Sequence, residues 1–402
     1  MKILQINVAV NTGSTGKIAE SIGLVLIEQN HQSVIAYGRS GRPSKSTTIK
    51  IGNKADQVLH LLKSRLFDKH AFGSKRATQQ LIIQIEKQQP DIIHLHNLHG
   101  YYLNIDVLFK YLKSTNIPVV WTLHDCWAFT GHCSFFDRVK CEKWRTVCYK
   151  CPLSNKYPAS LFIDKSTENY NKKKALFNGV KNLVLVTPSN WLHNLVQQSY
   201  LKHYPVKVIH NGINLSQFKI TETDSYQSKI IPTGGIIILG VASVWDRRKG
   251  LHDFIQLSKL INKDERIVLV GLTKNLMKGL PENIIGIERT ENLDELVELY
   301  NSATVFINPT WVDNFPTTNL EALACGTPVI TYHTGGSVEA VNEQTGFVIK
   351  KGDIPGLKSA IDQIRKNGKP FYSNHCRKRA ELFFNETQRV TDYVSLYQSI
   401  LS

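Results

Sequence analysis

The sequence predicts an α/β protein with two parallel-sheet domains in tandem. Its 402 residues suit two domains, or one large one. In both halves of the chain, short apolar runs alternate with longer helical patterns, which is typical of the βα units that build parallel sheets. The alternation pauses after a short strand at 207–209 and resumes beyond a polar stretch at 216–235. We therefore expect a first domain over residues 1–209, a second over residues 210–382, and a cleft between them.

The positions of the apolar runs predict the individual elements. In the first half we expect strands at 3–10, 33–37, 90–96, 117–123, 183–187 and 207–209, with helices at 18–29, 54–88 and 168–179. In the second half we expect strands at 236–242, 266–270, 284–287, 304–308 and 329–332, with helices from 251 and at 292–302. Amphipathic helices from about residue 375 end the chain, and the last segment, about 383–402, is expected to pack back on the first domain.

The chain is strongly basic, with a formal net charge of +16. This charge favours an anionic partner: a nucleic acid, an anionic membrane surface or a polyphosphate ligand. No nucleic-acid-binding motif or aromatic platform accompanies it, so we do not expect nucleic acid. No stretch reaches the roughly 18–20 apolar residues of a membrane-spanning helix, so membrane contact would be peripheral. The lysine run 172–174 is either a solvated face or a contact for anionic lipid.

Seven cysteines, an odd number, occur in a chain that begins with a strand pattern and not with a signal peptide. This predicts a reducing, cytoplasmic setting. Residues 126–163 form an aromatic, cysteine-rich insert in the first domain. Four of its thiols could hold a structural zinc, with His132 as a substitute ligand, or could be buried free thiols. Those four are Cys133, Cys141, Cys148 and Cys151.

Three places in the first domain have polar or glycine residues where a strand ends. Gly13 and Gly16 follow the first strand in a loop that suits a phosphate, a sugar or a plain tight turn. The strand at 90–96 ends in histidines, and the strand at 117–123 is followed by His124. Ligands of open α/β sheets bind at the carboxyl ends of strands, so these residues are site candidates. A structural hydrogen-bonding role for the histidines is the alternative.

The stretch from Asp313 to Glu321 places two carboxylates eight positions apart, with Pro316 between them. Pro316 suits the start of a helix, which would put Asp313 in the preceding loop and Glu321 in the second turn. The unpaired amides of that helix start would form an anion site, and a carboxylate can accept two hydroxyls. The two carboxylates are therefore either a helix-capping acid and a surface acid, or parts of a site for a sugar nucleotide.

These motifs together resemble the family-4 retaining glycosyltransferases, whose architecture of two Rossmann-like domains is called GT-B. The Asp313–Glu321 stretch is similar to that family's Glu-x7-Glu signature. The segments 211–214, 248–250 and 335–339 follow the family's order. The segment 124–127, with its cysteines, is similar to a subgroup in bacterial exopolysaccharide clusters, of the colanic-acid type.

The resemblance implies transfer of a sugar from a UDP- or GDP-sugar donor to a glycan or lipid-linked acceptor in cell-surface polysaccharide biosynthesis, without a catalytic cofactor. Lys249 and Arg248 would clamp the donor diphosphate, Glu321 would hold the ribose, and Asp313 would face the sugar. Gly13 and Gly16 would approach the donor from the first domain, and His124 would contact the sugar. The other donor-binding positions implied are Asn211, Phe315, Pro316, Thr317 and Thr318.

Two positions depart from the family pattern. Asp313 replaces the usual first glutamate and is one methylene shorter. Ser243 stands where many relatives carry a second arginine for the diphosphate, and Arg247 or Arg248 would substitute for it. Two alternative functions are therefore kept: a catalytically weak nucleotide-sugar-binding interaction protein, and a nucleotide-sugar epimerase or hydrolase of the same fold. Detecting sugar transfer or slow donor hydrolysis would discriminate between them.

Overall fold

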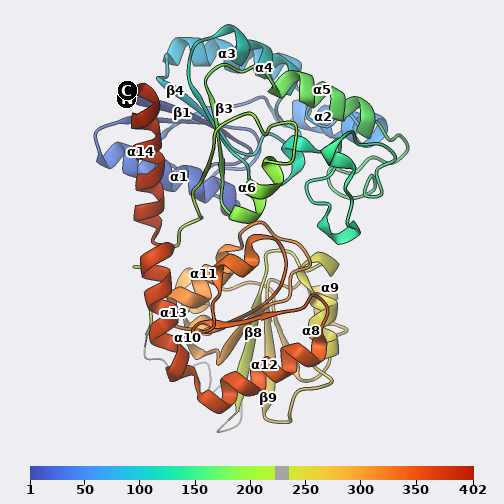
Figure 1. The fold of residues 1–402 in the computed structure, drawn as a ribbon, viewed down its shortest axis with the longest axis vertical. Helices are drawn as coiled ribbons and strands as arrows, with labels where there is room; N and C mark the ends of the chain where they lie inside the picture. Colours follow the sequence, from blue (N-terminus) through green and yellow to red (C-terminus); the bar gives the residue numbers. More distant parts are fainter. Residues whose placement is uncertain (222–234) are drawn as a thin grey trace. The chain divides into compact units, whose positions relative to one another are not determined.

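The computed structural model describes residues 1–221 and 235–402, which form two compact units (Figure 1). Unit 1 contains residues 1–210 and 390–402, and unit 2 contains residues 211–389. The sequence placed the corresponding division after residue 209. The C-terminal helix α14 (Glu386–Leu401) starts in unit 2 and continues into unit 1.

Unit 1 is built on a seven-stranded, all-parallel sheet with the strand order β3-β2-β1-β4-β5-β6-β7. The strands are β1 (Lys2–Asn7), β2 (Gln32–Tyr37), β3 (Thr47–Lys50), β4 (Ile92–Leu95), β5 (Val119–Thr122), β6 (Leu183–Thr187) and β7 (Val206–Val208). The helices are α1 (Gly13–Glu28), α2 (Lys54–Phe67), α3 (Lys75–Gln88), α4 (Ile105–Ser114), α5 (Ser166–Phe177) and α6 (Asn190–Val196). Apolar residues of α1 and α14 cover one face of this sheet, and those of α3 to α6 cover the other.

Unit 2 has a six-stranded, all-parallel sheet with the order β10-β9-β8-β11-β12-β13. The strands are β8 (Ile236–Val241), β9 (Glu265–Val270), β10 (Ile284–Ile287), β11 (Val305–Asn308), β12 (Val329–Tyr332) and β13 (Gly346–Ile349). The α-helices are α8 (Leu251–Leu257), α9 (Lys274–Met277), α10 (Leu293–Ser302), α11 (Thr317–Ala324), α12 (Ile354–Asn367) and α13 (Lys369–Phe383). Two short 3-10 helices, η4 (Arg247–Lys249) and η5 (Gly335–Ala340), lie at strand ends.

Both sheets confirm the predicted α/β class, and the expected strands are present within a few residues. Two strands were not predicted, β3 and β13. Both have four residues and lie at sheet edges, and β3 has a single apolar residue, Ile49. The predicted helical region 54–88 is two helices, since Asp68 takes a left-handed conformation (φ 50°) that ends α2. The helices expected from about residue 375 begin earlier, with α13 at Lys369.

The predicted basic helix is α5, and its lysine run is not a uniform solvated face. Lys172 is exposed, whereas Lys173 is buried, donates to the Trp127 carbonyl at 2.6 Å and lies 3.9 Å above the Trp127 ring. Burial lowers the pKa of Lys173 to about 7. The suggestion that residues 172–174 together contact lipid was therefore wrong for Lys173, because its amino group is buried and hydrogen-bonded inside unit 1.

Helix α14 is held on the sheet of unit 1 by a buried chain of hydrogen bonds. The Tyr397 hydroxyl donates to His94 Nδ1 at 2.6 Å, and His94 Nε2 donates to Thr122 Oγ1 at 2.8 Å. Thr122 in turn donates to the Tyr393 hydroxyl at 3.2 Å. Burial, and then the nearby His124, lower the pKa of His94 to about 3, so this histidine is neutral in the folded protein.

We expect Tyr397→Phe to destabilise unit 1 by about 1–3 kcal/mol, because it leaves His94 Nδ1 without a donor in the core. Thermal unfolding should show this loss, whereas Tyr149→Phe at an exposed position should show none. In the wild-type protein, the stability linked to His94 is complete above its ordinary pKa of 6.5 and is lost as the pH falls toward about 3. Equal melting temperatures for the two variants would contradict the role of Tyr397.

Candidate functional site

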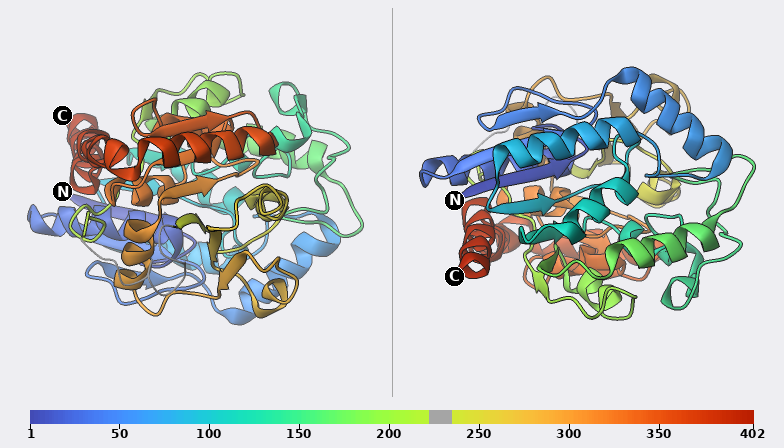
Figure 2. Two further views of the ribbon diagram at one scale, coloured as in Figure 1. Left: turned by 90° about the horizontal axis from the view of Figure 1, so that it is seen from below. Right: turned by 90° about the horizontal axis from the view of Figure 1, so that it is seen from above.

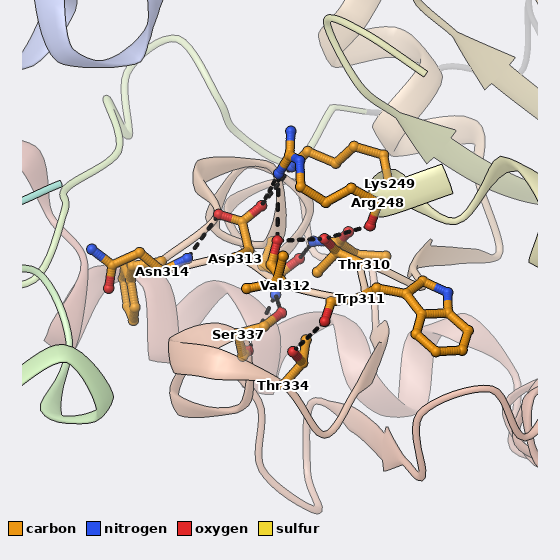
Figure 3. A network of polar contacts seen from close by, with 12 residues as sticks. Arg248, Lys249, Thr310, Trp311, Val312, Asp313, Asn314, Thr334 and Ser337 are labelled. Carbon is orange, nitrogen blue, oxygen red and sulfur yellow. Dashed lines mark hydrogen bonds and ion pairs between the residues drawn. The ribbon is translucent and has the colours of Figure 1, made fainter. Parts of the chain in front are cut away.

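Apart from Asn211, the predicted donor residues of unit 2 lie in the loop after β8 and in the loop and helix after β11, and the loop after β12 is joined to them. Figure 3 shows how these loops are joined. The Trp311 amide donates to the Arg248 carbonyl at 2.8 Å, which ties the β11 loop to the β8 loop. Thr334 Oγ1 donates to the Trp311 carbonyl at 3.0 Å, which ties in the β12 loop. Strands β8 and β11 are neighbours at the point where the strand order reverses, the usual ligand position of such sheets.

Two glycines allow these loops to approach one another. Gly250 has φ 79°, and a Cβ there would lie 2.3 Å from the Pro309 carbonyl oxygen. Gly335 has φ 51°, and a Cβ there would lie 1.8 Å from the Asp313 carbonyl oxygen. Both positions therefore exclude a side chain, for conformation and for space.

Lys249 and Asp313 form the central ion pair of the three loops, with 2.5 Å between Lys249 Nζ and Asp313 Oδ2. Asp313 Oδ1 accepts from the Asn314 amide at 3.0 Å, and Arg248 Nη1 lies 4.0 Å from Asp313 Oδ2. The Asp246 carboxylate accepts from the Lys249 amide at 3.0 Å and so fixes the 3-10 turn. Because the Lys249 and Asp313 side chains are only 20% and 17% exposed, their charges are partly shielded from solvent.

Helix α11 begins at Thr317, beside this ion pair, and Pro316 is its N-cap residue, one position before the first turn where Pro316 was expected. No side chain caps the helix start, and Thr317 and Thr318 are half-buried. Its first-turn amides carry the positive end of the helix dipole. The predicted loop position of Asp313 and second-turn position of Glu321 are confirmed.

Glu321 and Phe315 are each held by a residue from outside the motif. The Tyr300 hydroxyl donates to Glu321 Oε2 at 2.8 Å; burial, and then the Glu321 charge, keep the pKa of Tyr300 well above its ordinary value. The side-chain amide of Asn211 donates to the Phe315 carbonyl at 3.1 Å. The Phe315 side chain is buried in the core of unit 2, so its backbone is the part available at the loop.

Sequence reasoning missed the polar residues that support these loops from below. Asp253 accepts from Trp311 Nε1 at 2.7 Å and from the Tyr332 hydroxyl at 3.2 Å. The Asn319 side chain bonds both Asn308 and Ser337, at 2.8 and 3.1 Å. Tyr300 and Asp253 lie inside helices with no local signal, whereas Asn319, a polar residue on the buried side of α11, could have been noticed.

In unit 1, Gly13 and Gly16 lie at the start of α1, after β1. A Cβ at Gly16 would lie 3.3 Å from the Ala9 backbone, so the helix packs closely on the preceding loop. Gly13 has φ 65°, and a Cβ there would meet no atom within 4 Å, so its conformation, and not crowding, favours glycine. The Asn7 side chain holds the loop by donating to the Ala9 carbonyl at 2.8 Å.

His124 is oriented by a chain of hydrogen bonds that starts at Gln5 in β1. Gln5 Nε2 donates to the Ala19 carbonyl at 2.8 Å, so its Oε1 accepts from His96 Nε2 at 2.9 Å. A neutral His96 must then accept through Nδ1, which lies 3.3 Å from His124 Nε2. Burial lowers the pKa of His96 well below its ordinary value and that of His124 to about 4, so both rings are neutral. His124 therefore carries its proton on Nε2, and its Nδ1 is a hydrogen-bond acceptor.

A third histidine joins the insert to the sheet. His99 Nε2 donates to Asp125 Oδ2 at 2.8 Å, and His99 Nδ1 lies 2.8 Å from the Tyr157 hydroxyl. Burial opposes ionisation of Asp125, but the charge and hydrogen bond of His99 lower its pKa below the ordinary value. Because Tyr157 belongs to the insert, this triad holds the insert at the carboxyl ends of β4 and β5.

Four of the five cysteines of the insert line one small pocket together with His132: Cys133, Cys141, Cys148 and Cys151. Cys133 hydrogen-bonds to Cys151, which lowers the pKa of the Cys151 thiol to about 7. His132 is committed elsewhere, since its Nδ1 lies 2.7 Å from the buried Asp68 carboxylate. Across residues 1–221 and 235–402, no group of three or more His, Cys, Asp or Glu side chains has the arrangement of a metal site. All seven cysteines are without disulfide bonds.

Comparison with known proteins identifies the family of this chain. A family model described as Glycosyltransferase Family 4 matches residues 17–217, half of the 402 residues. A second family model, described as Glycosyl transferases group 1, matches residues 235–367. The chain belongs to glycosyltransferase family 4. The predicted resemblance and the GT-B fold are confirmed.

Individual relatives of this glycosyltransferase cover all or most of its length. WcaC of Escherichia coli K12, a glycosyl transferase provisionally named for colanic acid biosynthesis, is 25% identical over 100% of both chains. The N,N'-diacetylbacillosaminyl-diphospho-undecaprenol alpha-1,3-N-acetylgalactosaminyltransferase of Campylobacter jejuni is 23% identical over 74% of this chain and 81% of its own. The crystal structure of Anabaena HepE with UDP-glucose has a TM-score of 0.66 at 15% identity, covering 99% of this chain and 100% of its own, and therefore supports the fold.

The structure gathers part of the predicted site. In unit 2 it brings Arg248, Lys249 and Asp313 next to the start of α11, with Glu321 on the same helix. Arg248 and not the exposed Arg247 approaches Asp313, so Arg248 is the better substitute for the arginine absent at Ser243. The remaining candidates, Gly13, Gly16 and His124, lie at strand ends of unit 1. The roles assigned to all these residues stay predictions.

We expect Gln5→Met to allow both tautomers of His124. In this variant the Nε2 of His96 loses its acceptor, so His96 can carry its proton on either nitrogen and no longer has to accept from His124 through Nδ1. Ring-nitrogen NMR, with His124 assigned by comparison with His124→Gln, should change from an Nε2-protonated pattern to a mixture of both tautomers. Gln32→Met, at an exposed position on the neighbouring strand β2, is the matched control. An unchanged His124 pattern in Gln5→Met would contradict the hydrogen-bond chain from Gln5 through His96.

Proposed function

We propose that this glycosyltransferase transfers a sugar, with retention of configuration and without a catalytic metal, from a UDP- or GDP-sugar to a glycan or lipid-linked acceptor of a cell-surface polysaccharide. The observation that carries the proposal is the grouping of Lys249 and Arg248 with the start of α11, at the strand-order reversal of unit 2. Two cations and a set of helix amides suit a diphosphate leaving group.

The proposed reaction breaks the bond between the anomeric carbon and the diphosphate oxygen, and the bonding electrons leave with the diphosphate. An acceptor hydroxyl oxygen forms the new bond to the anomeric carbon on the same face. Its proton goes to an oxygen of the departing phosphate, so no protein base is needed. Lys249, Arg248 and the amides of α11 stabilise the charge that develops on the leaving group.

Asp313 has two tasks in this proposal. Its carboxylate positions the Lys249 ammonium, at a distance of 2.5 Å. It also stands where the family's sugar-facing carboxylate is expected. Glu321, held by Tyr300, is proposed to accept from the ribose hydroxyls, and the Nδ1 of His124 to accept from a sugar hydroxyl.

The relatives support the substrate classes. One carries the name of colanic acid biosynthesis, and another acts on a diphospho-undecaprenol acceptor, as its name states. A structural neighbour was crystallised with UDP-glucose. A lipid-linked acceptor would place the enzyme at the inner face of the cell membrane. No helix within the described residues is long and apolar enough to cross a bilayer.

We expect Lys249→Ala to lower sugar transfer at least about 100-fold, because one leaving-group contact is typically worth about 10²–10³ in rate. Transfer, or slow donor hydrolysis, is measured over a panel of UDP- and GDP-sugars, and NMR of the product gives the anomeric configuration. Lys274→Ala, at an exposed lysine of the same unit, is the matched control. Near-normal turnover of Lys249→Ala would contradict the role of Lys249 in binding the diphosphate. A product with inverted anomeric configuration would contradict the retaining mechanism.

The insert carries a separate, structural proposal: Cys133, Cys141, Cys148 and Cys151 bind one zinc. They line one pocket, and holding a metal would require their side chains to move closer than they stand here. We expect about one zinc per chain in protein purified without chelator, and less in Cys141→Ser. Cys325→Ser, in the core of unit 2, is the control. Substoichiometric zinc in the wild-type protein would instead identify these residues as buried thiols.

A further inference from the structure

Helix α2 has its polar side buried and its apolar side exposed. The buried residues of this helix are His60 and Ser64, each 1% exposed. On the outer side, Val58 is 54% exposed, Leu59 58% and Leu62 48%. An ordinary surface helix shows the opposite arrangement. The outer residues of α2 therefore do not contribute to the core of unit 1.

The buried side of α2 explains how the helix can be held without its apolar residues. His60 Nε2 accepts from the amides of Ala71 and Gly73 at 3.1 and 3.3 Å, and its Nδ1 lies 2.9 Å from Ser74 Oγ. Burial, and then the charge of Lys63, lower the pKa of His60 to about 4. Neutral His60 thus anchors the helix to the following loop through hydrogen bonds.

A second exposed segment extends the apolar side of α2. The Leu161 amide donates to the Arg65 carbonyl at 2.8 Å, so residues 161–163 lie against the C-terminal end of the helix. Leu161 is 60% exposed and Phe162 is 78% exposed. We call the combined surface the α2 surface; its members are Val58, Leu59, Leu62, Leu66, Phe67, Leu161, Phe162 and Ile163. Figure 2 shows α2, in blue, at the outside of unit 1. Exposed apolar groups of this size mark interaction sites.

The charges around the α2 surface are positive. Lys54, Lys63 and Lys69 are exposed on and just beyond the helix. The nearby acids are engaged within the chain: Asp56 caps the start of α2, and Asp68 is buried against His132. Asp164 accepts from the Cys151 and Ser166 amides at 2.5 and 2.8 Å. A basic rim around an apolar centre complements a bilayer with anionic headgroups.

We propose that the α2 surface docks the protein on an anionic membrane. Leu59, Leu62, Phe67 and Phe162 insert at the level of the headgroups, and the lysines pair with lipid phosphates. The surface differs from the one that the sequence suggested on α5, where Lys173 is buried. The docking proposal rests on the proposed function, because docking would bring the enzyme to a lipid-linked acceptor. Docking itself requires no sugar substrate.

The test is sedimentation with vesicles of phosphatidylglycerol and phosphatidylcholine, compared with phosphatidylcholine alone, over a range of salt. We expect binding that needs phosphatidylglycerol and weakens with salt. The double variant Leu59→Asp/Phe162→Asp should lower vesicle affinity at least about 10-fold, as should Lys54→Glu/Lys63→Glu. Ile83→Asp is the matched control, because Ile83 is 61% exposed on α3 but is not part of the α2 surface.

Three results would overturn the proposal: equal binding of the wild type and both double variants, equal binding to the two vesicle types, or a dimer in light scattering that Leu59→Asp/Phe162→Asp dissociates. The last would make the α2 surface a contact between two copies of the chain. Unfolding curves establish that the variants are folded. Donor hydrolysis in solution separates the two proposals: vesicle binding without activity on any donor contradicts the proposed function alone, whereas activity without vesicle binding contradicts the docking proposal alone.

Discussion

All strands of each sheet pair in parallel, so the carboxyl ends of a sheet lie along one edge. In both units the strand order runs 3-2-1-4 from the start of the unit, and the connections after the first and fourth strands diverge. The loops between them cannot cover that part of the edge, which leaves room for a ligand. Residues far apart in the sequence, such as Lys249 after β8 and Asp313 after β11, meet there for this reason.

Close approach of the backbone and side-chain hydrogen bonds together join the three loops of unit 2. Gly250 against Pro309 and Gly335 against Asp313 permit distances that a Cβ would prevent. The backbone bond from Trp311 to Arg248 then sets the separation between the β8 and β11 loops. With the loops fixed, the long Lys249 side chain needs only to extend to reach the Asp313 carboxylate. Asp313, although it is one methylene shorter than glutamate, therefore forms a close ion pair with Lys249.

Most strands and the Asp313–Glu321 helix start could be predicted, because buried strands require continuous apolar runs and a helix start has a local signal in Pro316. The predictions failed where no local signal exists. The edge strand β3 is polar and exposed, and Tyr300 reaches Glu321 from another helix. The exposure of the apolar side of α2 could not be predicted either. The sequence pattern of a helix shows which side is apolar, but it does not show which side faces the core.

His94 in β4, and His96 and His99 in the loop after it, have separate partners. His94 bonds the Tyr397 hydroxyl and secures α14. His96 bonds Gln5 and His124. The side-chain amide of Gln5 in β1 thereby sets the direction of the hydrogen bond to His124, the ring expected to contact the sugar. His99 bonds Asp125 and Tyr157 and secures the insert. Burial keeps His94 and His96 neutral. In the second of these hydrogen-bond chains the Gln5 carbonyl oxygen can only accept, so it fixes which nitrogen of His96 donates. Placing His124 at the end of the second chain thus determines which of its nitrogens can accept a hydrogen bond.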